Sequence, residues 1–175
     1  MWKLIARNLL ARPLTEPAPP PDEAALAALA ADVDKAARAR LGRSLSIRQV
    51  DAGSCNGCEL EIHALNNPYY DIERFGIRFV ASPRHADVLL VTGPVTANMA
   101  EALKRTYDAM PDPKWVVASG DCARDGGIFA GSYAVVGGVD ATVPVDLHIR
   151  GCPPTPTQLL AGLLALLRHV ARAGG

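Results

Sequence analysis

Four cysteines are the residues of this chain whose type and spacing point most directly to chemistry. Cys55 and Cys58 form a C-x-x-C pair, whereas Cys122 and Cys152 stand alone further along the chain. Four thiolates without another obvious ligand are the donor set of a zinc site or of an iron–sulfur cluster. Glycine, which lets the backbone approach a bulky ligand closely, flanks all of these cysteines, at positions 53, 57, 120, 126, 127 and 151.

The spacing favours iron–sulfur over zinc but leaves both open. A structural zinc site usually contains two C-x-x-C pairs and stabilises a small domain that lacks a core. This chain has one such pair, and its 175 residues, 49% of them hydrophobic, are enough to bury a core. Cys152 is followed by Pro153, as the last cysteine is in bacterial ferredoxins. Buried structural cysteines are a weak alternative, because all four lie in polar, glycine-rich segments.

The cysteine-bearing segments follow predicted β-strands. Strands are predicted at residues 45–50, 77–81, 87–92, 115–118 and 145–149, helices at 58–66, 96–110 and 158–173, and a short turn or helix at 68–75. This alternation predicts an α/β protein with a doubly wound, flavodoxin-like parallel sheet. The loops beyond the carboxyl ends of such strands form the ligand crevice. We therefore expect all four thiols at one edge of the sheet.

The first 43 residues are predicted to be an N-terminal helical arm on a main domain that spans residues 44–175. The arm would contain an amphipathic helix at residues 2–11, a proline-rich linker at 13–21 and an Ala/Leu-rich helix at 22–41. We expect the first helix to dock on a membrane partner, with packing on another subunit as the alternative.

Composition limits the location and the partners. No apolar run reaches the roughly 18–20 residues of a membrane-spanning helix, and no signal-peptide core is recognised, so a cytoplasmic location is expected. The formal net charge is +0, and no dense basic stripe is present. Both observations argue against a nucleic-acid partner.

Five motifs occur in a fixed order along the chain: CNGCE at 55–59, SPRHAD at 82–87, GDC at 120–122, VPVD at 143–146 and GCPPT at 151–155. Together they resemble the small, 20 kDa subunit shared by respiratory NADH–quinone oxidoreductase and membrane-bound, energy-converting [NiFe] hydrogenases. The resemblance covers about residues 45–168. It implies that Cys55, Cys58, Cys122 and Cys152 ligate one [4Fe–4S] cluster beside the active site of a large partner subunit.

The first loop distinguishes the branches of this family. The quinone-reducing subunit typically has adjacent cysteines there, whereas Asn56 and Gly57 separate the two cysteines here, as in hydrogenase small subunits. The pattern resembles the formate-hydrogenlyase and carbon-monoxide-linked branch. The chain also ends soon after the fourth cysteine, so the next electron carrier is expected to be a separate, ferredoxin-like subunit.

This resemblance implies electron transfer between a ferredoxin-like subunit and the [NiFe] site of a large subunit, where 2H⁺ + 2e⁻ = H₂. Integral membrane subunits would hold the complex at the inner face of the cell membrane. The equivalent subunit of an NADH–quinone oxidoreductase or of a sulfur-reducing relative is one alternative. A zinc-stabilised binding module without a redox role is another.

Glu59 is the candidate catalytic residue of this chain. It directly follows Cys58, and a carboxyl group at the edge of a cluster can relay protons toward the partner's active site. An ion pair at an interface, or a favourable charge at a helix N-terminus, explains the same residue equally well.

Overall fold

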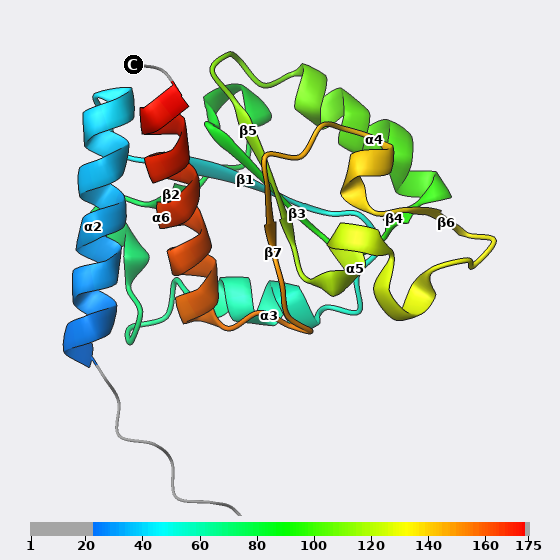
Figure 1. Ribbon diagram of the computed structural model, residues 1–175, viewed down its shortest axis with the longest axis horizontal. Coiled ribbons are helices and arrows are strands. Elements are labelled where there is room, and N and C mark those ends of the chain that lie inside the picture. Colours follow the sequence, from blue (N-terminus) through cyan, green and yellow to red (C-terminus); the bar gives the residue numbers. More distant parts are fainter. Residues whose placement is uncertain (1–22, 174–175) are drawn as a thin grey trace, which may run out of the picture.

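The computed structural model describes residues 23–173, which form a parallel sheet covered by helices on both faces (Figure 1). Within these residues, the main sheet contains β1 (Ser46–Asp51), β2 (Arg78–Phe79), β3 (Val88–Thr92), β5 (Trp115–Ser119) and β7 (Leu147–Ile149). The strand order is β2-β1-β3-β5-β7, and every pairing is parallel. If the five strands of this sheet are renumbered one to five in chain order, their order across the sheet becomes 2-1-3-4-5, which is the order in flavodoxin. The predicted doubly wound, flavodoxin-like fold is confirmed.

Two hydrophobic layers separate the sheet from its helices. Helices α2 (Glu23–Leu41), α3 (Gly57–Ala64) and α6 (Pro156–Ala173) cover one face, and α4 (Ala97–Asp108) and α5 (Asp121–Asp125) cover the other (Figure 1). Neighbouring strand residues alternate between the layers: Leu90 and Val117 contact the first, Leu89 and Val116 the second. Because β3 and β5 are buried at every position, their sequences read as continuous apolar runs.

Helix α2 packs against α6 on the face of the sheet that α2, α3 and α6 cover. Its buried residues are Leu26, Ala30, Val33 and Ala37, which lie on one helical face and belong to the same cluster as the sheet residues. The helix predicted at 22–41 is therefore confirmed. The predicted helix at 2–11 and the linker at 13–21 lie outside the described residues, and the domain boundary at residue 43 stays a prediction.

Helix α6 begins earlier than predicted. Thr155 and Gln158 form a reciprocal cap, in which Thr155 Oγ accepts from Gln158 N at 3.3 Å and Gln158 Oε1 accepts from Thr155 N at 2.8 Å. Thr155 therefore caps the start of this helix. No helix in the described part of the chain has the length and hydrophobicity that crossing a membrane requires.

Several short elements were not predicted from the sequence. Strands β4 (Val95–Thr96) and β6 (Val135–Gly137) form a separate antiparallel pair, so Thr96 belongs to a strand and α4 starts one residue later. Helix α5 was also missed. Residues 23–173 contain four 3₁₀ turns, of which only η1 (Ile72–Phe75) falls in a predicted turn. The other three, η2 (Pro83–His85), η3 (Gly127–Phe129) and η4 (Val139–Ala141), were not predicted. Elements this short show no hydrophobic periodicity.

Candidate functional site

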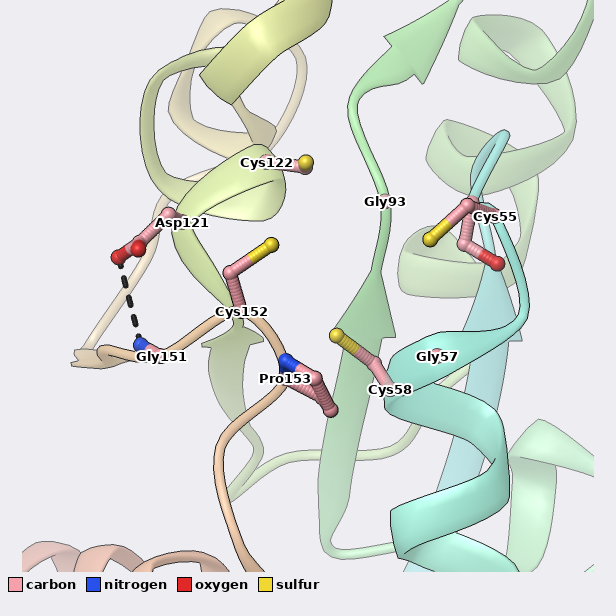
Figure 2. A pocket seen from close by; sticks show the side chains of 10 residues that line it. Cys55, Gly57, Cys58, Gly93, Asp121, Cys122, Gly151, Cys152 and Pro153 are labelled. Atoms are coloured by element: carbon pink, nitrogen blue, oxygen red, sulfur yellow. Dashed lines mark hydrogen bonds between the residues drawn. The ribbon is translucent and has the colours of Figure 1, made fainter. Parts of the chain in front are cut away.

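The four cysteines line one cavity at the carboxyl edge of the main sheet (Figure 2). Cys55 lies in the loop after β1, Cys58 in the first turn of α3, Cys122 in α5, and Cys152 in the loop between β7 and α6. Their sulfur atoms point into the shared space in Figure 2. The cavity has a volume of about 90 Å³. The expected convergence of the thiols at one edge is therefore observed, and their role as ligands stays a prediction.

Strand register brings these loops together. Asp51 of β1 pairs with Thr92 of β3, Thr92 pairs with Ser119 of β5, and Ser119 pairs with Ile149 of β7. The four strands thus end at the same level, and each chain segment leaves the sheet on the same side. Three of the segments carry the cysteines, and the fourth brings Gly93 to the cavity.

Hydrogen bonds join the two later cysteine loops. Asp121 N donates to Gly151 O at 2.9 Å, and Gly151 N donates to Asp121 Oδ1 at 3.3 Å (Figure 2). Gly120 N also donates to Ile149 O at 2.8 Å, which continues the ladder between β5 and β7. The segments that carry Cys122 and Cys152 are therefore fixed to each other.

Two glycines give the thiols room. A Cβ atom at Gly120 would lie 2.7 Å from Cys58 Sγ, and one at Gly127 would lie 2.8 Å from Cys122 Sγ. Real Cβ atoms do not approach a sulfur so closely, and both glycines also have positive φ angles, +93° and +51°. Any other residue at either position would push a sulfur out of place.

The first cysteine loop is organised by polar groups that were not predicted. Asp51 Oδ1 accepts from Gly53 N at 2.8 Å and from Ser54 N at 2.7 Å. Ser54 Oγ donates to Glu59 Oε2 at 2.6 Å and accepts from Asn56 N at 3.1 Å. The sequence signal that could have revealed Ser54 is its place immediately before the C-x-x-C pair.

Glu59 lies where the sequence predicts it, in the first turn of α3 beside Cys58, but it is buried at 5% exposure. Its second carboxyl oxygen, Oε1, is also buried and has no hydrogen-bond partner among the described residues. A helix N-terminus favours a negative side chain. The structure does not pair Glu59 with a basic side chain in residues 23–173.

The environment disfavours negative charge on the thiols. Burial, as the largest cause, together with neighbouring Glu59 and the other three cysteines raises the pKa of Cys58 to about 12. Burial also raises the pKa of Cys122, with Cys152 adding to the shift. Cys55 and Cys152 are exposed. Cysteines ligate a metal as thiolates. Thiolates gathered in one cavity need a bound cation to compensate their negative charge.

The donor set fits a cluster of several metal atoms. The described residues contain no group of three or more His, Cys, Asp or Glu side chains arranged to hold a metal ion. The four thiols line one cavity together with Gly57, Gly93 and Gly151, which have no Cβ. An iron–sulfur cluster takes each cysteine at a separate iron atom, and backbone N–H groups approach its sulfurs. The four cysteines would hold such a cluster, which supplies one-electron transfer when bound.

A flavodoxin-like sheet with a thiol-lined cavity at its carboxyl edge defines the class of this protein. Residues 55–166, which include all four cysteines, match the family described as NADH ubiquinone oxidoreductase, 20 Kd subunit. The chain belongs to this family.

Two curated relatives are subunits of hydrogen-metabolising enzymes by name. Formate hydrogenlyase subunit 7 of Escherichia coli (strain K12) is 49% identical over 139 residues, which cover 78% of this chain and 54% of the relative. The probable membrane-bound hydrogenase subunit mbhJ of Pyrococcus furiosus is 47% identical over 132 residues, which cover 75% and 79%. The chain spans about half the length of the first relative.

A solved structure has the same fold. A chain of the membrane-bound sulfane sulfur reductase, an archaeal respiratory membrane complex, superposes with a TM-score of 0.66 at 36% sequence identity. The match covers 79% of this chain and 75% of that chain. The resemblance to the small subunit of the hydrogenases and of NADH–quinone oxidoreductase is thereby confirmed.

Proposed function

We propose that this chain is the electron-transfer subunit of a membrane-associated, energy-converting [NiFe] hydrogenase. Its single [4Fe–4S] cluster, on Cys55, Cys58, Cys122 and Cys152, relays electrons between a ferredoxin-like subunit and the [NiFe] site of a large subunit. The observation that carries the proposal is the convergence of four cysteines, from three loop regions far apart in sequence, on one cavity. The names of the two relatives, a formate hydrogenlyase subunit and a membrane-bound hydrogenase subunit, support H₂ as the substrate.

The residues of this chain hold and orient the redox group rather than transform a substrate. The three loops leave the sheet at one level, and the paired loops of Cys122 and Cys152 form one wall of the cavity. Exposed Cys55 and Cys152 lie on the open side of the site. A partner that binds on this side would bring its redox group within a short distance of the cluster, which favours electron transfer across the interface. The reaction 2H⁺ + 2e⁻ = H₂ takes place at nickel in the partner.

We also propose a proton-relay role for Glu59, toward the active site of the large subunit. The carboxyl group is buried beside Cys58, and its Oε1 atom has no partner among the described residues, which leaves this oxygen free to take up and release a proton. Integral membrane subunits would hold the complex at the inner face of the cell membrane, with this chain bound peripherally.

A sulfur-reducing complex is the second candidate. It is favoured by the likeness to a chain of the sulfane sulfur reductase at 36% identity. The same cluster would serve there with a different acceptor in the partner. The spacing of Cys55 and Cys58 argues against the quinone-reducing branch, in which the two cysteines are adjacent.

Metal analysis of the native complex tests the assignment. The complex is purified anaerobically through a tag on this chain, and its nickel, iron and zinc contents are measured. Nickel near one atom per complex, with iron in excess, is the expected result. Iron without nickel would contradict the hydrogenase assignment and favour sulfur or quinone reduction. Zinc in place of iron would contradict the cluster itself.

A further inference from the structure

Ser54 is at the centre of a hydrogen-bond chain that spans the first cysteine loop. Its hydroxyl oxygen accepts from Asn56 N at 3.1 Å, and its hydroxyl proton is donated to Glu59 Oε2 at 2.6 Å. One side chain thus joins the middle of the loop to the first turn of α3. Cys55 and Cys58 lie within the segment that this chain spans.

The loop needs such support because Asn56 has a left-handed backbone conformation. Its φ and ψ angles are 71° and −1°, which are uncommon for a residue other than glycine. Asn56 is the N-cap residue of α3, but its own side chain makes no capping hydrogen bond. This turn directs Cys55 and Cys58 into the same cavity (Figure 2). The hydroxyl oxygen of Ser54 accepts a hydrogen bond from the backbone N–H of Asn56.

The backbone of Ser54 is fixed from two sides. Asp51 Oδ1 accepts from Ser54 N at 2.7 Å. Gly93, at the end of β3, packs so closely that a Cβ there would lie 2.4 Å from Ser54 N. Since the backbone is anchored, the direction of the Ser54 hydroxyl is determined by its two partners.

We propose that Ser54 is a positioning residue, which holds Cys55 and Cys58 in the geometry that ligates the cluster. This inference rests on the proposed [4Fe–4S] function. Removal of the hydroxyl leaves the buried carboxylate oxygen of Glu59 without a partner, and an unsatisfied buried acceptor is costly. The loop then relaxes, and the sulfurs move away from the cavity.

The first test compares Ser54→Ala and Ser54→Thr in the native complex, purified anaerobically. Iron release to a chelator and the electron paramagnetic resonance (EPR) spectrum of the reduced complex are measured. Ser54→Ala should release the iron of this cluster about tenfold faster and change its EPR signal, as loss of an outer-shell partner commonly does. Ser54→Thr keeps a hydroxyl and should restore both properties.

Ser132→Ala is the matched control. Ser132 Oγ also accepts from a backbone N–H two residues ahead, Ala134 N at 3.4 Å, but Ser132 does not line the cavity. This variant should match the wild type in iron release and in EPR. Ser54→Ala indistinguishable from Ser132→Ala would overturn the inference. A wild-type complex in which this chain holds no cluster would instead overturn the proposed function.

A double-mutant cycle separates the hydrogen bond from other effects. Glu59→Gln keeps an acceptor oxygen and should retain iron as the wild type does, whereas Glu59→Leu removes the acceptor of Ser54 and should release iron faster than the wild type. The double variant Ser54→Ala with Glu59→Leu should be no worse than Ser54→Ala alone, because Ser54→Ala already removes the hydrogen bond to Glu59 together with the one from Asn56 N. Additive effects on iron release would contradict the inference.

Discussion

Gly120 lies directly against the sulfur of Cys58, so that a Cβ at Gly120 would be 2.7 Å from Cys58 Sγ. This contact joins two segments that are distant in sequence, the end of β5 and the start of α3. It also means that the position of the second sulfur depends on the absence of a side chain in another loop. The site is therefore a property of the sheet edge as a whole and not of the C-x-x-C motif alone.

Gly120→Ala should displace Cys58 and weaken retention of the cluster about tenfold or more, because the new methyl group needs the space of the sulfur. Chelator-induced iron release measures the effect. Gly131→Ala is the control, since Gly131 also has a positive φ, +79°, but its Cβ would meet no atom within 4 Å. Iron release from Gly120→Ala that is no faster than from Gly131→Ala would contradict the role of the contact with the sulfur.

Glu59→Gln should lower hydrogen turnover about 100-fold or more, because the amide cannot exchange a proton, while the EPR signal of the cluster stays in place. Turnover with a reduced donor and EPR are measured on the same complex. Glu61→Gln, on the same helix, serves as the control and should stay near the wild-type rate. Hydrogen turnover at the wild-type rate in Glu59→Gln would contradict the proton-relay role and leave only a structural role for this carboxylate.

The raised pKa of Cys58 predicts its reactivity in the cluster-free chain. The thiolate is the nucleophile, so a thiol whose pKa is raised from 9.0 to about 12 carries little thiolate at pH 9. Iodoacetamide should therefore modify Cys58 more slowly than exposed Cys55 and Cys152, and the rate at Cys58 should keep rising between pH 9 and 12. Mass spectrometry of timed samples gives the four rates. Cys58 reacting first at pH 9 would contradict the buried position.

Asp87 holds the start of β3 through a part-buried ion pair that is remote from the cysteines, in which its carboxylate is buried and the Arg43 side chain is half exposed. Its carboxylate accepts from Arg43 Nη1 at 3.0 Å and from Ser46 N at 2.9 Å. Asp87→Ala should reduce the free energy of unfolding by about 2 kcal/mol, mainly because it leaves the buried Ser46 N–H without its acceptor, whereas the half-exposed Arg43 can turn to solvent. Circular dichroism melting measures the loss.

Asp108→Ala is the control for this stability prediction. Asp108 forms an exposed ion pair with Lys104 at 2.7 Å, and exposed pairs contribute about 0–1 kcal/mol. The melting temperature of Asp108→Ala should stay close to that of the wild type. A similar loss in the two variants would show that the Asp87 pair does not fix the strand.

The doubly wound, flavodoxin-like sheet could be predicted because strands Val88–Thr92 and Trp115–Ser119 are buried at every position and largely apolar, and because helical segments alternate with the strands. The convergence of the cysteines followed from the same order, since each one comes after a strand end. Glu59 was placed correctly beside Cys58, but its burial was not foreseen. Burial depends on packing from segments far away in sequence.

Contacts made only by the folded chain could not be predicted. The role of Gly93 depends on the close approach of Ser54 in the loop after the neighbouring strand β1, and that of Gly120 depends on the position of the Cys58 sulfur. The hydrogen bond from Ser54 to Glu59 requires the left-handed turn at Asn56, which a residue other than glycine rarely adopts. The pair β4–β6 is too short to produce an alternating pattern.

The most direct test of the central claim is EPR and Mössbauer spectroscopy of the anaerobically purified complex, compared with four variants that each replace one cysteine by alanine. The account predicts one [4Fe–4S] signal that is lost or strongly altered in each of Cys55→Ala, Cys58→Ala, Cys122→Ala and Cys152→Ala, while signals from other subunits persist. A spectrum unchanged in all four variants, or zinc in place of this iron, would contradict it.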